Sequence, residues 1–164
     1  MLERLWADWR SEYVSSAAVT NAAAGCVMCN LVAAPDDAEA LVLERTEHTI
    51  TVMNLFPYGS GHLMVTTVRH VASYVDLDDA ENAAVAQAQV RALRAITGAY
   101  APDGVNMGAN LGRAAGAGVP GHLHVHLLPR WSGDTNFMTA VAETRVLPES
   151  LRAGYDKLRA AWPR

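Results

Sequence analysis

Residues 122–128, His-Leu-His-Val-His-Leu-Leu, constrain the fold more than any other segment of the chain. Successive side chains in a β-strand point to opposite faces, so a strand here places the imidazoles of His122, His124 and His126 on one face. The apolar residues between them then point into a core on the other face. Imidazole is both a nucleophile and a proton carrier near neutral pH, so this row indicates a catalytic or metal-binding surface. The alternative is a solvated strand face filled with polar residues.

The segments around this strand predict an α+β fold with a mostly antiparallel sheet of five strands. Runs rich in β-branched and apolar residues predict strands at 41–45, 49–54, 62–68, 105–111 and 122–128. The pair Asp78 and Glu81 predicts a capping box at the start of a long helix that ends at Gly98. A final helix is expected over 148–161 and a short one over 1–14, with residues 15–40 mostly irregular.

Length and composition narrow the class of protein. The 164 residues contain no internal repeat and no linker, which predicts a single domain over 1–164 whose segment 1–40 carries the cysteine pair. The formal net charge of −4 argues against a basic surface for long DNA or RNA. No run of about 18 apolar residues is present, so no membrane span is expected. The first residues lack the pattern of a secretion signal, and the cytoplasm is the expected location.

A glycine-rich loop from Asn110 to Gly118 precedes the histidine row. Its three glycines allow backbone N–H groups to approach a ligand closely, as loops that bind phosphate do. Such a loop is usually no more than a connection, but this one leads directly into the histidine row. The order of the two segments therefore favours a phosphate-bearing ligand beside the histidines.

Together these segments resemble the histidine triad family, whose signature is His-x-His-x-His followed by two apolar residues. Residues 54–65, Asn-Leu-Phe-Pro-Tyr-Gly-Ser-Gly-His-Leu-Met-Val, are similar to the first nucleotide-binding segment of that family. Residues 6–10, 115–118 and 129–137 resemble a bacterial branch related to Fhit-type dinucleoside polyphosphate hydrolases and diadenosine tetraphosphate phosphorylases. The resemblance covers nearly the whole chain and implies the fold of that family.

The resemblance implies roles for the histidine row. The middle histidine, His124, attacks the α-phosphorus and forms a covalent nucleotidyl-histidine, which water, phosphate or another acceptor then releases. His126 contacts the α-phosphate or the bridging oxygen and assists the leaving group, and His122 belongs to the same catalytic row. The carbonyl groups of Leu127 and Leu128 are expected to orient the other ring nitrogen of His124.

The resemblance also implies a substrate-binding set, which consists of Asn54, His62, Asn110, Gly116 and Gly118. Asn54 matches a position on the ribose or base side, while His62 either contacts substrate or supports the histidine row. The loop departs from the Fhit-type hydrolases, which usually carry Gln where Ala117 stands and have one residue fewer. Because that Gln handles phosphate and the incoming water, its absence favours phosphate as the acceptor.

The chain has two cysteines, Cys26 and Cys29, separated by two residues. Taken alone, such a pair fits a metal site, a redox motif or two small buried hydrophobic residues. The resemblance implies that both cysteines, with His70 and His122, form the zinc site that many members of the family keep. Two thiolates and two imidazoles make a closed tetrahedral site for Zn²⁺, which would be structural.

The leading expectation is an enzyme that cleaves dinucleoside polyphosphates such as diadenosine tetraphosphate, by hydrolysis or phosphorolysis. The alternatives are a nucleoside phosphoramidase or a hydrolase of adenylylated compounds, and a nucleotide-binding module without catalysis. Intact His124 and His126 argue against a pure binder. Arg113 is a candidate for holding a polyphosphate tail, and Trp131 for stacking on a base or packing at an interface. The resemblance further implies a homodimer in which two five-stranded sheets join.

Overall fold

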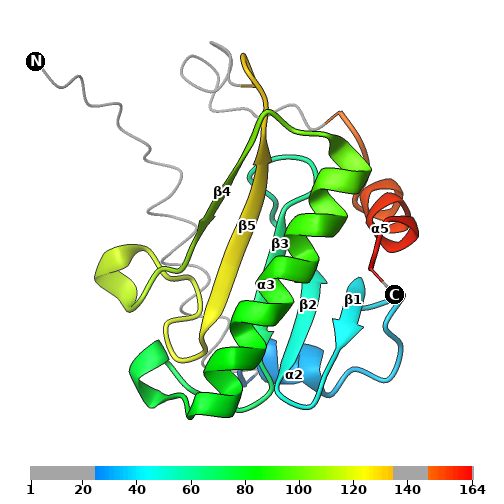
Figure 1. Cartoon of the computed structure of the whole chain (residues 1–164). Helices are drawn as coiled ribbons and strands as arrows, with labels where there is room; N and C mark the ends of the chain where they lie inside the picture. Colours follow the sequence, from blue (N-terminus) through cyan, green and yellow to red (C-terminus); the bar gives the residue numbers. More distant parts are fainter. Residues whose placement is uncertain (1–24, 135–147, 164) are drawn as a thin grey trace, which may run out of the picture.

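The computed structural model describes residues 25–134 and 148–163, and these form one antiparallel sheet with helices on both faces (Figure 1). The strands are β1 (Val42–Arg45), β2 (Thr49–Met53), β3 (Leu63–Thr67), β4 (Gly104–Gly108) and β5 (His124–Arg130). Their order in the sheet is β1-β2-β3-β5-β4, and every neighbouring pair is antiparallel. The predicted α+β class and five-stranded antiparallel sheet are confirmed. That the whole chain is one domain stays a prediction.

Three helices and two short 3₁₀ turns complete the described part of the chain. They are α2 (Val27–Val32), η1 (Tyr74–Asp76), α3 (Asp79–Tyr100), η2 (Arg113–Ala115) and α5 (Leu151–Ala160). Figure 1 shows α3 lying across one face of the sheet, with α5 beside it near β1 and α2 behind the sheet. Among the described residues, no helix has both the length and the apolar character needed to cross a membrane.

The two faces of the sheet carry separate cores. On one face, apolar side chains pack against α3 and α5 in a buried cluster that includes Leu43, Met53, Leu63, Val65, Leu127 and Ile96, and the part-buried Val105 of β4 packs against it. On the other face, Val52 and Met64 pack with Met28 of α2 in a smaller cluster. Residues directly opposite each other in an antiparallel pair share a face, and Met64 pairs with His126. The histidines of β5 therefore lie on the α2 face.

Helix α3 begins as the sequence predicts and ends later. The Asp78 side chain accepts from the backbone N–H of Glu81, and the Glu81 side chain accepts from the backbone N–H of Asp78. The predicted end at Gly98 is two residues short, because the helix continues to Tyr100. It stops where Ala101 adopts a left-handed conformation with φ of 42° ahead of Pro102. A residue that precedes proline is disfavoured in helical conformation, which explains the stop.

Strand β5 begins and ends two residues later than predicted. It starts at His124, so His122 lies before the strand and is not part of its alternation. It also runs through Pro129, which pairs with Val105 of β4. Proline has no N–H group, but β3 begins at Leu63, which pairs with Leu127, so at Pro129 the strand has a paired strand on one side only.

Several other boundaries differ from prediction: β1, β2 and β3 are each shorter by one residue at one or both ends, and α5 covers 151–160 of the helix expected over 148–161. Residues 15–40 were expected to be mostly irregular, but the short helix α2 forms within them and contains Cys29. Strand β4 ends at Gly108 rather than at residue 111, and the loop toward η2 follows it. The predicted final helix is confirmed as α5, with the Ser150 hydroxyl accepting from the Ala153 N–H at its start. The short helix expected over 1–14 lies outside the described residues.

Candidate active site and metal site

The pairing of β3 with β5 holds two histidines side by side. His124 lies opposite Thr66 and His126 lies opposite Met64. Their rings are 5.1 Å apart between centroids and nearly perpendicular. His124 is only 6% exposed, whereas His126 is half-buried. The predicted sharing of a face by these two imidazoles is confirmed.

The His124 ring is oriented by a main-chain group. Its Nδ1 lies 2.7 Å from the carbonyl oxygen of His122. A carbonyl can only accept, so Nδ1 of His124 carries the proton and donates it. The lone pair of the neutral ring is then on Nε2. The expectation that Leu127 or Leu128 supplies this carbonyl is wrong, because His122 supplies it.

The His126 ring is oriented by His62. The backbone N–H of Tyr58 donates to Nδ1 of His62 over 3.0 Å, so the proton of the His62 ring is on Nε2. That Nε2 lies 3.0 Å from Nδ1 of His126 and donates to it. A neutral His126 therefore carries its own proton on Nε2. The buried His62, with no exposed surface, is placed to support the histidine row.

The two neighbouring histidines therefore hold opposite tautomers. Nε2 of His124 has a lone pair that can attack an electrophile, and Nε2–H of His126 can donate a hydrogen bond to the oxygen of a leaving group. Each assignment starts from a backbone group whose role as donor or acceptor is fixed. The arrangement supplies a nucleophile and a hydrogen-bond donor for a leaving group on the same strand face.

Asn54 lies at the end of β2, close to this chain of histidines. Its Oδ1 accepts from the backbone N–H of Phe56 over 2.9 Å, and its Nδ2 lies 3.5 Å from Nδ1 of His62. The next two side chains are apolar and exposed, Leu55 at 50% and Phe56 at 64%. Exposed apolar side chains beside a catalytic row are a suitable surface for a flat, apolar group.

The segment between β4 and β5, which contains the glycine-rich loop, begins and ends beside the histidine row. Gly108, the last residue of β4, pairs with His126, and the chain returns to the row at His124. Gly112 and Gly116 have φ of 81° and 90°, a region that side chains other than glycine seldom adopt. Ala117 is buried and its N–H donates to the carbonyl of Gly112 over 3.3 Å, so the loop folds back on itself. Asn110, Gly116 and Gly118 of the predicted phosphate set are all part-exposed in this loop.

The four predicted metal ligands are brought together. One donor atom from each of Cys26, Cys29, His70 and His122 lies within 4.8 Å of all the others. The Sγ of Cys26 is 3.4 Å from Nδ1 of His122, and the Sγ of Cys29 is 3.2 Å from Nδ1 of His70. A tetrahedral zinc site with bonds of about 2.3 Å to sulfur and 2.0 Å to nitrogen has sulfur–nitrogen separations of about 3.5 Å. The donor set therefore fits a tetrahedral metal ion.

Main-chain contacts prepare His122 for this role. Its Nε2 lies 2.8 Å from the carbonyl oxygen of Thr67 and donates to it, which leaves a lone pair on the Nδ1 that faces the cysteines. Burial lowers the pKa of the His122 imidazole below its usual value, which keeps the ring neutral. Burial, followed by the neighbouring Cys26, raises the pKa of the Cys29 thiol. A bound cation would reverse that effect, because it favours the thiolate.

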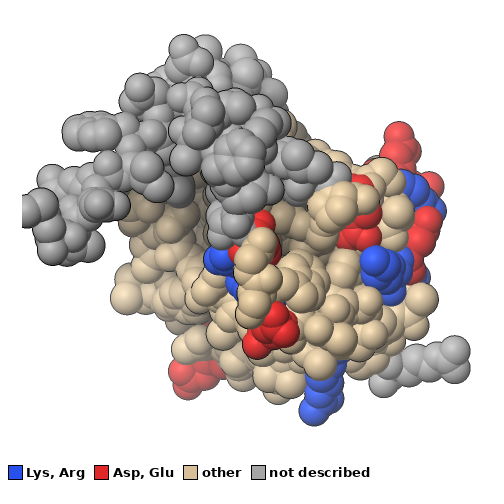
Figure 2. Space-filling model, turned by 90° about the horizontal axis from the view of Figure 1, so that it is seen from above, with Lys and Arg blue, Asp and Glu red and all other residues tan. Residues whose placement is uncertain are grey.

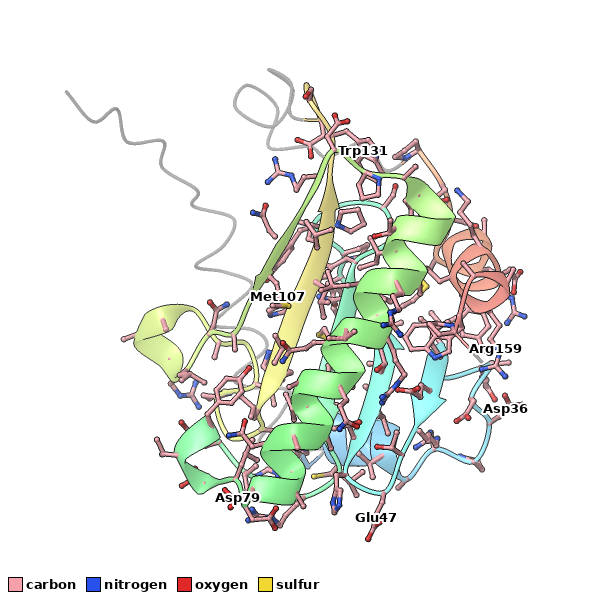
Figure 3. The ribbon with its side chains drawn as sticks, in the orientation of Figure 1. Asp36, Glu47, Asp79, Met107, Trp131 and Arg159 are labelled. Carbon is pink, nitrogen blue, oxygen red and sulfur yellow. The ribbon has the colours of Figure 1, made fainter. Side chains whose placement is uncertain are left out.

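Sequence reasoning missed the groups that orient the rings. The backbone N–H of Tyr58 and the carbonyls of Thr67 and His122 determine three tautomers. Main-chain atoms have no signature in the sequence, so only the strand register reveals them. Trp131 packs edge-on against Tyr100, with ring centroids 6.0 Å apart, at the end of β5 (Figure 3). That contact accounts for Trp131 within the fold.

Comparison with known proteins agrees with this geometry. A family model of the HIT domain matches residues 36–133, more than half of the chain. The chain is 38% identical over 167 residues to a Mycobacterium tuberculosis protein named AP-4-A phosphorylase, covering 99% of this chain and 86% of the relative. A Zn-bound histidine triad family protein from Mycobacterium smegmatis has a similar structure, with a TM-score of 0.67, 30% identity and coverage of 84% and 92% of the two chains. A hypothetical histidine triad nucleotide-binding protein from Sulfolobus tokodaii gives a TM-score of 0.68 at 25% identity, covering 83% of this chain and 91% of that one. The chain therefore belongs to the HIT domain family.

Proposed function

We propose that the protein cleaves dinucleoside polyphosphates such as diadenosine tetraphosphate, with orthophosphate as the acceptor. The opposite tautomers of His124 and His126 carry the proposal, because they place a nucleophile beside a hydrogen-bond donor. The relative named AP-4-A phosphorylase supports this substrate class and this acceptor.

The first step transfers a nucleotide to the enzyme. Nε2 of His124 attacks the α-phosphorus, and the bond from that phosphorus to the bridging oxygen breaks as the new phosphorus–nitrogen bond forms. Nε2–H of His126 donates a hydrogen bond to the bridging oxygen and so stabilises the negative charge on the departing nucleotide, while the proton stays on His126. With diadenosine tetraphosphate, this step yields ATP and adenylylated His124. The hydrogen bond from Nδ1 of His124 to the His122 carbonyl strengthens as the ring becomes positively charged.

The second step returns the nucleotide to phosphate. An oxyanion of orthophosphate attacks the same phosphorus, the phosphorus–nitrogen bond breaks, and its electron pair returns to Nε2 of His124. The product is ADP, and His124 regains its neutral Nδ1–H tautomer. At the position where the Fhit-type hydrolases usually carry Gln, the buried Ala117 offers no polar side-chain atom to orient a water. This difference supports phosphate over water as the acceptor.

The surrounding residues bind the substrate. Backbone N–H groups of the loop from Asn110 to Gly118 receive the phosphates, because glycine permits their close approach. Asn54 positions the ribose, and the exposed side chains of Leu55 and Phe56 form the surface for the base. Figure 2 shows acidic and basic side chains interspersed among other residues on the described surface seen from above.

Cys26, Cys29, His70 and His122 hold a Zn²⁺ ion in this proposal. All four tetrahedral positions are then filled by side chains, so the ion supplies structural cross-linking rather than an activated water. The Zn-bound Mycobacterium smegmatis relative supports this choice of metal.

The proposed oligomer is a homodimer formed through β4, and the two edges of the sheet support this choice. The β1 edge has a bulge, and its Val42 and Leu43 carbonyls accept from Tyr155 and Arg159 of α5. The β4 edge has a regular register, and no described residue pairs with its outer side. Its Met107 is 52% exposed (Figure 3). An unprotected apolar edge favours pairing with a second copy.

Sedimentation equilibrium tests the dimer. Met107→Asp places a charge at the proposed joint and is expected to give a monomer. Val75→Asp is the control, because Val75 is 89% exposed in η1, away from the β4 edge. A monomeric wild type, or a dimer that Met107→Asp leaves intact, would reject β4 as the interface.

Product analysis tests the reaction. Purified protein is incubated with diadenosine tetraphosphate, with and without orthophosphate, and the nucleotides are separated by chromatography. ADP and ATP that appear only with phosphate support phosphorolysis, whereas AMP and ATP without phosphate establish hydrolysis instead. If only an adenosine phosphoramidate is cleaved, the substrate class is wrong and the phosphoramidase alternative holds. His124→Ala controls for contaminating enzymes.

A further inference from the structure

His122 contributes two groups to two different places. Its ring, through Nδ1, faces the cysteines of the metal site at 3.4 Å and 3.6 Å. Its main-chain carbonyl accepts the proton of His124 Nδ1 at 2.7 Å. One residue therefore joins the ligand set to the nucleophile, with no other side chain between them.

The segment that carries this carbonyl is held by individual hydrogen bonds rather than by the sheet. His122 precedes β5, so its carbonyl is not held by the strand ladder. It follows Gly121, whose backbone has more freedom than that of any other residue type. Main-chain bonds hold its neighbours: Leu123 N–H donates to the Val71 carbonyl at 2.6 Å, and the Leu123 carbonyl accepts from the Thr66 hydroxyl at 2.7 Å. The His122 N–H donates to the Val119 carbonyl at 3.3 Å, and the His122 ring donates to the Thr67 carbonyl. The orientation of the His122 carbonyl therefore depends on where the ring is held as well as on these bonds.

We infer that the metal site positions the nucleophile: Cys26, Cys29 and His70 hold the His122 ring so that its carbonyl selects the Nδ1–H tautomer of His124. His122 is then a positioning residue as well as a ligand. The inference deepens the proposed function and rests on the nucleophilic role of His124.

The consequence of losing this constraint follows from tautomer chemistry. The tautomer of a neutral imidazole is set by the hydrogen bond that one of its nitrogens makes. Without the aligned carbonyl, His124 also adopts the tautomer with the proton on Nε2. That form has no lone pair on the nitrogen that faces the substrate, so it cannot attack phosphorus. Substrate binding involves other residues and is retained.

The test compares zinc-loaded wild type with protein whose site is emptied in two ways. A chelator removes zinc, with metal content checked by atomic absorption. His70→Ala removes an exposed ligand and leaves the three less exposed ligands in place, so it provides a folded sample even if chelation unfolds the chain. His70→Cys restores four ligands. Met28→Ala is the matched control, because Met28 packs α2 on the sheet without being a ligand.

The main readout is the ¹⁵N spectrum of the His124 imidazole, which distinguishes the two neutral tautomers. We expect one Nδ1–H species in wild type, His70→Cys and Met28→Ala, and a mixture in the emptied proteins. The rate of adenylyl transfer to the enzyme is expected to fall about tenfold or more when the site is empty, as for other outer-shell changes. The dissociation constant for AMP is expected to change less than about twofold.

A single Nδ1–H tautomer with an undiminished transfer rate in the emptied proteins would overturn the inference. A loss of that tautomer in Met28→Ala would overturn it too, because general loosening of α2 would then explain the effect. If zinc-loaded wild type cleaves no dinucleoside polyphosphate, the proposed function fails. The tautomer spectra still decide whether the metal site positions His124 in that case.

Discussion

His124 and His126 are the same residue type, two positions apart on the same face of β5, yet their neighbours give them different chemistry. Nδ1 of His124 faces an acceptor, the carbonyl of His122, so the Nε2 lone pair is available. Nδ1 of His126 faces a donor, the Nε2–H of His62, so Nε2 carries the proton. The comparison teaches that roles within a histidine row are assigned by the partner of each ring rather than by the residue type.

The groups that orient the two imidazole rings also differ in kind. His124 depends on a main-chain carbonyl whose residue is a metal ligand. His126 depends on a buried side chain, His62, whose own tautomer is determined by the N–H of Tyr58. Breaking one support should therefore leave the other histidine largely unaffected.

Removing the nucleophile gives the largest expected effect. His124→Ala is expected to lower kcat by about 10⁴-fold or more, because the covalent step has no substitute. The dissociation constant for AMP, measured by calorimetry, should stay within about threefold of wild type. Retention of more than a small fraction of the turnover would show that His124 is not the nucleophile.

Breaking the His126 support should cost less and depend on the leaving group. His62→Phe removes the donor to His126 and is expected to lower kcat on diadenosine tetraphosphate by about 10²-fold, because the leaving oxygen loses its aligned N–H donor. With a p-nitrophenyl ester of AMP, whose p-nitrophenolate delocalises its own negative charge, the loss should be much smaller. His62→Gln keeps an N–H donor and is the matched control. Equal losses on both substrates would argue against a role of His126 in stabilising the leaving group.

Removing the metal is expected to destabilise the His124 side of the site. Chelation should lower Tm by about 10 °C, because the ion cross-links Cys26 and Cys29 of the N-terminal segment to the sheet. Added zinc should restore Tm, and Cys29→Ser should show no response to chelator. A melting temperature that ignores both chelator and zinc would mean that the four residues hold no metal.

Arg113, a positively charged residue outside the histidine row, is expected to affect substrate binding and not turnover. Arg113 is exposed in η2, in the loop that joins the two histidine-bearing ends of β4 and β5. Arg113→Ala is expected to raise KM for diadenosine tetraphosphate about fivefold and to leave kcat within about twofold, the size of one exposed charged contact. Arg94→Ala, an exposed arginine on α3, controls for the change in net charge. A lower kcat with unchanged KM would contradict this role.

The smallest expected effect concerns the stability of the fold in acid, which depends on Glu81 rather than on the histidines. The Arg69 guanidinium, followed by the backbone N–H of Asp78, lowers the pKa of Glu81 to about 2. The folded pKa lies below the usual value of about 4.3, so the ionised carboxylate stabilises the fold above that pH, and this stabilisation is lost as pH falls toward 2. In Glu81→Gln, Tm should fall less steeply than in wild type between about pH 4.5 and 2. An equal slope in both proteins would assign the acid sensitivity elsewhere.

Much of the fold could be predicted from local patterns. The alternation in residues 124–128 determined the face of β5, and Asp78 with Glu81 marked the start of α3, because both signals are local. The position of Pro129 within β5 was not predictable, because it depends on where β3 begins beside it. Helix α2 was missed for a similar reason, since its six residues are held by packing of Met28 rather than by propensity.

The candidate site, like the fold, could be predicted only in part. The spacing of the histidines and cysteines, with the family resemblance, indicated which side chains meet, and His70 does lie 5.0 Å from His122 between ring centroids. The tautomers could not be inferred, because they depend on main-chain atoms of Tyr58, Thr67 and His122 placed by strand register. Which residues form the site could be predicted from the sequence, whereas the orientation of each imidazole ring depends on the fold.

The central claim is that His124 becomes adenylylated while Nε2–H of His126 stabilises the leaving nucleotide through a hydrogen bond. The most direct measurement is peptide mass spectrometry after the enzyme reacts with diadenosine tetraphosphate without phosphate and is quenched under non-acidic conditions. We expect adenylyl on His124 in wild type, none in His124→Ala, and loss of the adduct when orthophosphate is added before the quench. Adenylyl on another residue, or an adduct that persists in His124→Ala, would contradict the account.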